Sequence, residues 1–203
     1  MGGFFGAVSH RDCVLDIFFG VDYHSHLGTR RGGMAIYDPD GGFQRQIHNI
    51  ENTPFRTKFE RVLSEMSGNA AIGCISDTDP QPLLVRSVHG TYAICVVGVI
   101  QNEEAIIEQM LGDADRHFEA MSGGRVNSNE LVAALISQQP TIAEGIRYAQ
   151  SVVEGTVSVL IMTPDFLIAG RDKMGRLPVL IGRDQNGCCI SFESFAYHKL
   201  GYQ

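Results

Sequence analysis

Short apolar stretches alternate with turn-forming residues along most of the chain, and this pattern predicts β-strands. The most apolar stretch spans residues 91–100, and we interpret it as a core strand. The cluster Asp38-Pro39-Asp40-Gly41-Gly42 is typical of a turn, and the glycine-rich residues 28–33 are predicted to form another. Further strands are predicted over residues 4–8, 34–37, 70–75, 157–162, 166–171, 177–182 and 188–192.

Other segments place their apolar residues at the spacing of one helix face. Residues 55–66 do so most clearly, and a further helix is predicted to start from a cap at Asn127 or Ser128. Helices are also predicted over residues 12–23, 103–111 and 142–153. Strands come in runs of two between helices, which favours an α+β layer architecture over regular βαβ alternation. No second-domain boundary is evident, so we expect a single domain spanning residues 1–203.

Composition and charge argue against some classes of function. Hydrophobic residues make up 44% of the 203 positions and charged residues 19%, which is typical of a folded globular protein. The formal net charge of -7 argues against a nucleic-acid partner, since such partners usually face a basic surface. No apolar run approaches the roughly 18 residues of a membrane span, and no signal peptide is evident. We therefore expect a cytoplasmic protein without a membrane partner.

The five cysteines indicate neither a disulfide framework nor a zinc site, because no Cys-x-x-Cys pair occurs. We expect all five to be reduced and mostly buried. A metal site at His24 and His26, placed on one face of a strand, is a weaker alternative that lacks a third ligand at suitable spacing. We expect no metal and no cofactor.

Several segments in order along the chain resemble class II glutamine amidotransferases, with the amidophosphoribosyltransferase branch as the best fit. Gly2-Gly3-Phe4-Phe5-Gly6 resembles the Cys-Gly-hydrophobic-Phe-Gly start of these domains. His26-Leu27-Gly28 resembles their His-Arg-Gly segment, and the longest match runs from Gly155 through Gly182. Gln81-Pro82-Leu83 and Phe192-Glu193-Ser194 correspond to a Gln-Pro-Leu segment and a Ser-Glu pair.

This resemblance implies an N-terminal nucleophile hydrolase-like fold, a four-layer αββα sandwich of two antiparallel sheets. In active members a cysteine that becomes residue one attacks the side-chain amide of glutamine. An Asn side chain and a Gly backbone N–H bind the oxyanion, an Arg holds the substrate carboxylate, and an Asp receives the ammonium group. The released ammonia passes to a phosphoribosyl-transferring domain.

The resemblance places these roles on residues that lack the required chemistry. The nucleophile position falls on Gly2, and the oxyanion pair falls on Val97 and Gly98, of which Val97 offers no side-chain donor. Loss of one such donor typically costs about 3 kcal/mol of transition-state stabilisation. Ser76 stands in place of the Arg and Ser128 in place of the Asp. His26 is kept, although Leu27 replaces the neighbouring Arg.

The combined losses predict a catalytically degenerate glutaminase-like domain with a structural, regulatory or ligand-sensing role. The sequence motifs of a phosphoribosyltransferase domain are absent, so the chain is either truncated after its glutaminase-like part or a naturally short paralogue. We expect a homo-oligomer and a small polar partner such as glutamine or a related amino acid. Ser76, Asp77 and Asp79 form either a ligand-binding loop or an ordinary turn, and Asp172 with its basic neighbours is predicted to form a solvated hairpin.

Two other functions stay open. In the first, the domain is an active amidotransferase or hydrolase with a different nucleophile, either Cys74 or a water activated by the α-amine of Gly2 after removal of Met1. In the second, it is an oligomeric scaffold without a pocket function.

Overall fold

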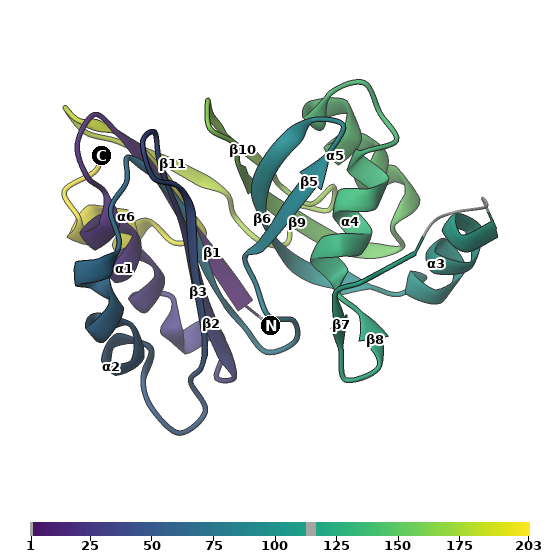
Figure 1. Ribbon diagram of the computed structural model, residues 1–203, viewed down its shortest axis with the longest axis horizontal. Coiled ribbons are helices and arrows are strands. Elements are labelled where there is room, and N and C mark those ends of the chain that lie inside the picture. The colour runs from purple at the N-terminus through teal and green to yellow at the C-terminus, as the bar shows by residue number, and fades with distance from the viewer. Residues whose placement is uncertain (1, 113–116) are drawn as a thin grey trace.

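Two antiparallel sheets face each other between outer layers of helices in the computed structural model, which describes residues 2–112 and 117–203 (Figure 1). Met1, on which the removal step depends, lies outside the described residues. The predicted fold class, a four-layer αββα sandwich, is confirmed.

The larger sheet has six strands in the order β11-β12-β1-β4-β2-β3. All neighbouring strands run antiparallel, and β1 pairs with β4 in a register that sets Gly2 opposite Ser76. The strands are β11 (Leu180–Arg183), β12 (Gly187–Ser191), β1 (Gly2–Ser9), β4 (Ala70–Ser76), β2 (Arg31–Asp38) and β3 (Gly42–Asn49).

The smaller sheet has four strands in the order β10-β9-β6-β5, again all antiparallel. They are β10 (Leu167–Gly170), β9 (Gly155–Met162), β6 (Gly90–Ile100) and β5 (Leu83–Ser87). A separate hairpin is formed by β7 (Met121–Ser122) and β8 (Arg125–Val126).

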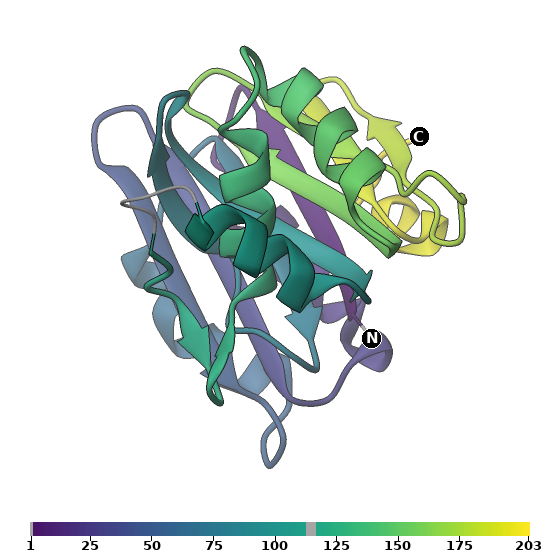
Figure 2. The same cartoon turned by 90° about the vertical axis from the view of Figure 1, so that its right-hand side faces the viewer.

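Helices cover the outer face of each sheet. The six-stranded sheet carries α1 (Val14–Asp22), η1 (Ser25–Leu27), α2 (Phe55–Phe59), η2 (Glu60–Glu65) and α6 (Ser194–Lys199). The four-stranded sheet carries α3 (Glu103–Gly112), α4 (Ser128–Ile136) and α5 (Ile142–Val152). Figure 2 shows the green helices α4 and α5 lying across the strands of this second sheet.

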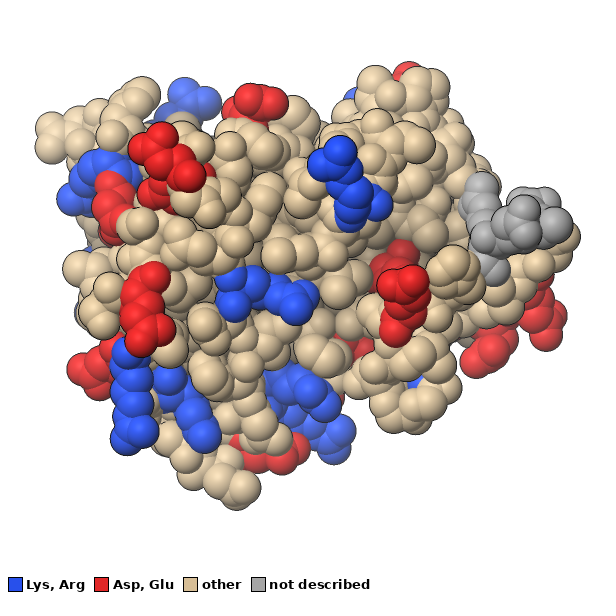
Figure 3. Space-filling view, in the orientation of Figure 1, with Lys and Arg blue, Asp and Glu red and all other residues tan. Residues whose placement is uncertain are grey.

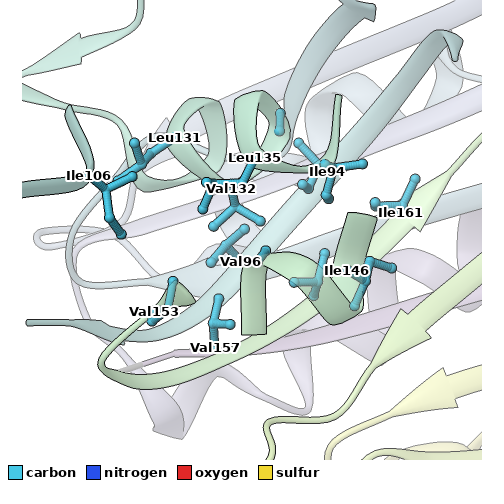
Figure 4. Close-up of a cluster of buried hydrophobic side chains, with 14 of the residues drawn as sticks. Ile94, Val96, Ile106, Leu131, Val132, Leu135, Ile146, Val153, Val157 and Ile161 are labelled. Carbon is cyan, nitrogen blue, oxygen red and sulfur yellow. The ribbon is translucent and has the colours of Figure 1, made fainter. Parts of the chain in front are cut away.

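Three apolar layers hold the sandwich together, one under each helix layer and one between the sheets. The layer between the four-stranded sheet and its helices is shown in Figure 4, where Val132 and Leu135 of α4 meet Ile94 and Val96 of β6. The layer between the sheets includes Phe4. Full burial of each such side chain stabilises the fold by roughly 1.5–3 kcal/mol before entropic costs.

The glycine-rich segment is the clearest correction to the predicted elements. Residues 28–33 were predicted to form a turn, but β2 already begins at Arg31. Gly32 and Gly33 are therefore strand residues, and a Cβ at Gly33 would collide with the backbone carbonyl oxygen of Gln81. Glycine serves here for close approach between a strand and a loop, not for a turn.

Smaller corrections concern element type and number. The predicted helix over residues 55–66 is an α-helical turn, α2, followed by the 3₁₀ segment η2. Sequence patterns gave no prediction for β3, β5, β7, β8 or α6. The other predicted strands and helices are confirmed within a few residues at their ends, and Asn127 caps α4 by accepting a hydrogen bond from the Asn129 backbone N–H.

The distribution of charges on the surface and the burial of the cysteines can be compared with what the composition predicted. Acidic and basic side chains are interspersed over the face shown in Figure 3. Among the described helices, none is both long and apolar enough to cross a bilayer. No cysteine is paired in the structure; four are buried and Cys188 is half-buried, which confirms that they are mostly buried.

Candidate functional site

A cavity of about 320 Å³ opens where the two sheets end together. The first residue of β1, the end of β4, the end of β6 and the start of β9 all reach it, and the loops after β4 and β10 complete its walls. Figure 1 shows this end of β1 between the sheets, next to the mark of the N-terminus. The lining residues are Gly2, Ser76, Thr78, Asp79, Gln81, Val96, Val97, Gly98, Val99, Ile100, Ser128, Thr156, Arg176 and Leu177.

Most of the site positions expected from the sequence meet at this cavity. Gly2, Ser76, Val97, Gly98 and Ser128 all line it, although they come from four different elements. Their assembly follows from the strand pairing, because β1 pairs with β4 in the larger sheet and β6 lies across from them in the smaller one. The candidates His26 and Cys74 are not among the lining residues.

Gly2 occupies a position where the backbone leaves no room for a side chain. It lies opposite Ser76 in the β1–β4 ladder, and a Cβ built on it would collide with the carbonyl oxygen of Ile75. The end of β1 is therefore shaped for glycine, and any larger residue requires the backbone to shift.

Val97 and Gly98 form the wall contributed by β6. The Val97 side chain is 5% exposed and packs between the sheets, so it presents no hydrogen-bond donor to the cavity. A Cβ at Gly98 would collide with the carbonyl oxygen of Thr156 on the neighbouring strand, which explains glycine at this position. This wall is consequently apolar apart from its backbone.

The loop between β4 and β5 is fixed by side-chain hydrogen bonds to the backbone. Ser76 Oγ accepts a hydrogen bond from the Thr78 backbone N–H at 3.2 Å. Gln81 binds the backbone of Val96 twice, donating from Nε2 at 3.1 Å and accepting at Oε1 at 2.8 Å. The amide of Gln81 is thus committed to holding this loop against β6.

The same loop also contacts the start of α4. Asn127 Nδ2 donates to the Pro80 carbonyl oxygen at 3.1 Å, and Asp79 Oδ2 accepts from the Ser128 backbone N–H at 3.2 Å. Asp79 is only 8% exposed, so a carboxylate lies buried beside Ser128, at the position where the resemblance expects an aspartate. The helix N-terminus is a favourable setting for this negative charge.

The loop after β10 forms the facing wall and is organised by Asp172. This carboxylate is 4% exposed and accepts hydrogen bonds from the backbone N–H groups of Met174 at 2.9 Å, Arg176 at 2.9 Å and Leu177 at 3.4 Å. The prediction of a solvated hairpin is wrong for Asp172, because three backbone donors satisfy it away from water. Sequence reasoning missed this role, although an Asp followed by Gly175 is a turn signal.

The two histidines do not form a metal site of the kind considered. His24 follows α1 and His26 lies in η1, so the expected shared strand face is wrong. His24 Nδ1 donates to the Gly20 carbonyl oxygen at 2.6 Å and His24 Nε2 lies 3.2 Å from Ser191 Oγ, whereas His26 is bonded to Glu193 near the surface. Among the described residues, no three His, Cys, Asp or Glu side chains are grouped as metal ligands would be.

Cys74 lies in the apolar layer between the sheets. It is on the same face of β4 as Ser76 but one pleat deeper, and its side chain is 1% exposed. It contacts Cys95 of the facing sheet, and burial raises the pKa of the Cys95 thiol well above its usual value. The location of Cys74 argues against the displaced nucleophile considered from the sequence, because a nucleophile must reach its substrate.

The paired antiparallel sheets and the two helix layers are those of the N-terminal nucleophile hydrolase fold, and in this arrangement the chain resembles class II glutamine amidotransferase domains. Its sequence relatives are amidophosphoribosyltransferases. The chain is 28% identical to the amidophosphoribosyltransferase of Methanocaldococcus jannaschii and 25% identical to that of Bacillus subtilis, and both alignments cover 98% of this chain. No family model matches the chain.

Solved structures agree on the fold. The chain superposes with a TM-score of 0.84 on the glutamine phosphoribosylpyrophosphate amidotransferase of B. subtilis complexed with ADP and GMP, at 24% identity over 99% of this chain. A structure described as the allosteric regulatory enzyme of purine biosynthesis matches equally well. The chain spans less than half the length of these proteins, 44% of the M. jannaschii relative and 44% of the B. subtilis structure.

Proposed function

We propose that this chain is a glutaminase-like domain that does not hydrolyse glutamine and that uses the cavity to bind a small polar molecule as a regulatory or ligand-sensing module. The observation that carries the proposal is the cavity itself. The residues to which the resemblance assigns the nucleophile, oxyanion, carboxylate and ammonium roles surround one space, and the described residues that line it include no cysteine. The similarity to amidophosphoribosyltransferases suggests glutamine or a related amino acid as the ligand and a role connected with purine biosynthesis.

Two further observations support the loss of hydrolysis. Val97 cannot donate a hydrogen bond to an oxyanion, and the loss of one such donor typically costs about 3 kcal/mol of transition-state stabilisation. The backbone around Gly2 excludes a side chain at the nucleophile position, since Ile75 occupies the space that a Cβ requires. The residues that lack the chemistry expected of the nucleophile and of the oxyanion donor, Gly2 and Val97, therefore line the same cavity.

The alternative functions have less support. Hydrolysis through Cys74 would require the thiol to leave a layer in which it is 1% exposed. A water activated by the α-amine of Gly2 depends on removal of Met1 and stays a prediction. The scaffold function and the expected homo-oligomer likewise stay predictions, and a sedimentation measurement at micromolar concentration tests both.

A glutaminase assay on the purified chain tests the proposal, with the state of Met1 established by mass spectrometry. We expect ammonia release at the background rate for the wild type, for Cys74→Ala and for Cys95→Ala. Cys95→Ala is the matched control, because Cys95 is equally buried and belongs to the facing sheet. Glutamine hydrolysis that Cys74→Ala abolishes and Cys95→Ala retains would overturn the proposal.

The variant Gly2→Cys tests the same site from the other direction. We expect it to remain inactive, because its Cβ collides with the Ile75 carbonyl oxygen and because Val97 still offers no donor. Activity in this variant would mean that the site needs only its nucleophile, so that the loss of function is confined to one residue.

A further inference from the structure

Two opposite charges line the cavity, and neither has an ionic partner among residues 2–112 and 117–203. Asp79 lies on the loop after β4 and Arg176 on the loop after β10. Neither residue belongs to an ion pair with any other residue that the structure describes, and they are not paired with each other. A carboxylate and a guanidinium that face one cavity without meeting are complementary to a ligand that carries both charges.

Asp79 needs a partner more than Arg176 does, because burying a carboxylate costs free energy unless hydrogen bonds or a cation stabilise its charge. Within the described part of the chain, its side chain accepts one hydrogen bond, from the Ser128 backbone N–H at 3.2 Å to Oδ2. Asp172 of the facing loop is similarly buried but accepts three backbone hydrogen bonds. Asp79 thus keeps acceptor capacity for a donor that enters the cavity, such as an ammonium group.

Arg176 is held in place by its backbone rather than by its side chain. Its backbone N–H donates to Asp172 Oδ2 at 2.9 Å, which fixes the loop, while no hydrogen bond from its guanidinium to a described residue is formed. A guanidinium fixed at its backbone and free at its planar end suits a carboxylate, which it binds through two parallel hydrogen bonds.

The rest of the lining combines an aliphatic surface with the hydroxyl groups of four side chains, Ser76, Thr78, Ser128 and Thr156. Val97, Val99 and Leu177 contribute aliphatic surface, and the exposed fraction of Val99 is 62%. The one amide side chain among the lining residues, Gln81, already uses both its donor and its acceptor on Val96. A glutamine amide would therefore depend on the lining hydroxyl groups for its hydrogen bonds, whereas an aliphatic side chain packs against the valine and leucine surface without needing a partner.

We propose that the cavity binds a free aliphatic α-amino acid, with its ammonium group at Asp79, its carboxylate at Arg176 and its side chain against Val97, Val99 and Leu177. This inference rests on the proposed ligand-binding function and names its ligand class. The charged clamp differs from the one that the resemblance implies, because Ser76 and Ser128 occupy those positions and two loop residues supply the charges instead. A volume of about 320 Å³ is adequate for a molecule of this size.

Calorimetric titration of the full chain tests the ligand class. The probes are L-leucine, L-valine, L-glutamine, leucine methyl ester, which lacks the carboxylate charge, and N-acetyl-leucine, which lacks the ammonium charge. We expect leucine or valine to bind more tightly than glutamine, and each modified leucine to bind roughly ten- to a hundredfold more weakly than leucine, because a charge-assisted contact is lost.

Two variants assign the charges to residues. Asp79→Asn is expected to weaken leucine binding by roughly tenfold or more while leaving N-acetyl-leucine unaffected. Arg176→Gln is expected to weaken leucine binding to a similar extent while leaving leucine methyl ester unaffected. Asp165→Asn and Arg61→Gln are the matched controls, since both residues are exposed and neither lines the cavity. Circular dichroism and urea unfolding verify that each variant is folded.

The outcomes separate this inference from the proposed function. Tighter binding of glutamine than of leucine, or unchanged leucine affinity in both charge variants, overturns the aliphatic clamp and leaves ligand binding in place. Absence of binding for every amino acid overturns both. Glutamine hydrolysis in the assay overturns the proposed function alone, because leucine binding at Asp79 and Arg176 would still be measurable.

Discussion

Two polar regions of this domain differ in how their groups are satisfied. In the first, His24 and Ser191 are fully buried where α1 meets β12. His24 binds the Gly20 carbonyl oxygen at 2.6 Å and lies 3.2 Å from Ser191 Oγ, and Ser191 Oγ also accepts from the Glu193 backbone N–H at 3.1 Å. In the second region, the cavity, Asp79 has one backbone donor among the described residues.

Whether a polar side chain has its hydrogen-bond partners inside the protein distinguishes structural groups from ligand-facing groups better than its residue type does. A Ser–His pair is typical of catalysis, yet here both side chains form hydrogen bonds inside the protein and neither is among the residues that line the cavity. Asp79 and Arg176 look unremarkable in the sequence, but they line the cavity and have no ionic partner in the part of the chain that the structure describes. We therefore expect changes around His24 to affect stability and changes at the cavity to affect binding.

The largest expected effect is on folding stability when His24 is truncated. His24→Ala removes two buried hydrogen-bond contacts and leaves a void, so we expect the free energy of unfolding to fall by about 2–4 kcal/mol in urea titrations. His26→Ala is the matched control, because the His26 side chain is 53% exposed and its contact with Glu193 lies near the surface. A decrease in the free energy of unfolding of less than about 0.5 kcal/mol for His24→Ala would contradict the structural role assigned to His24.

A second expected effect is a pH dependence of stability that originates at His24. Burial lowers the pKa of His24 below its usual value of 6.5, although the bond to the Gly20 carbonyl opposes the shift. Below about pH 6.5 the unfolded chain therefore takes up a proton that the folded state refuses, so stability is lost as the pH falls toward the folded-state pKa. The slope for one proton is at most about 1.4 kcal/mol per pH unit.

Urea titrations at pH 7, 6 and 5 measure this dependence, with His24→Gln as the comparison. We expect the variant to lose less stability than the wild type over this range. The pKa of His48 is also lowered by burial and acts with the same sign, so only the difference between the two proteins reports on His24. Parallel curves would mean that His24 does not couple folding to pH.

The smallest expected effect comes from two serines. Ser128→Ala at the cavity should change the free energy of unfolding by less than about 0.5 kcal/mol, because no hydrogen bond from its side chain to a described residue is formed and alanine favours a helix. Ser191→Ala should cost about 1–2 kcal/mol, because it leaves buried partners unpaired. Equal losses in thermal or urea unfolding would contradict the distinction between the regions.

Much of the fold was predictable from local patterns. The run over residues 91–100 predicted β6, and the helical spacing over residues 142–153 predicted α5, because both elements bury a continuous apolar face. β3 and β5 escaped prediction because both are only half-buried and carry mixed residues, which leaves little contrast between faces. The turn predicted to include Gly33 was wrong, because a glycine that lets a strand approach a loop closely cannot be distinguished in the sequence from a glycine in a turn.

The site was predictable only where an ordered resemblance indicated it. Gly2, Ser76, Val97, Gly98 and Ser128 all line one cavity, and their assignment to the family's roles stays a prediction. Arg176 was missed because its loop looks like any charged hairpin, and Asp79 could not be separated from an ordinary turn residue. Whether a loop carboxylate is paired depends on backbone groups that are distant in sequence.

The sequence by itself determined the α+β class, because apolar periodicity is a local property. Its resemblance to class II glutamine amidotransferases implied the four layers and assigned glycine, not cysteine, to the nucleophile position. Tertiary structure decided which polar groups are satisfied and which are open. It buried Cys74 between the sheets, gave Asp172 three backbone donors and set Asp79 and Arg176 on separate walls of one cavity. Hydrogen-bond satisfaction depends on contacts between segments that are far apart in the chain, and these form only on folding.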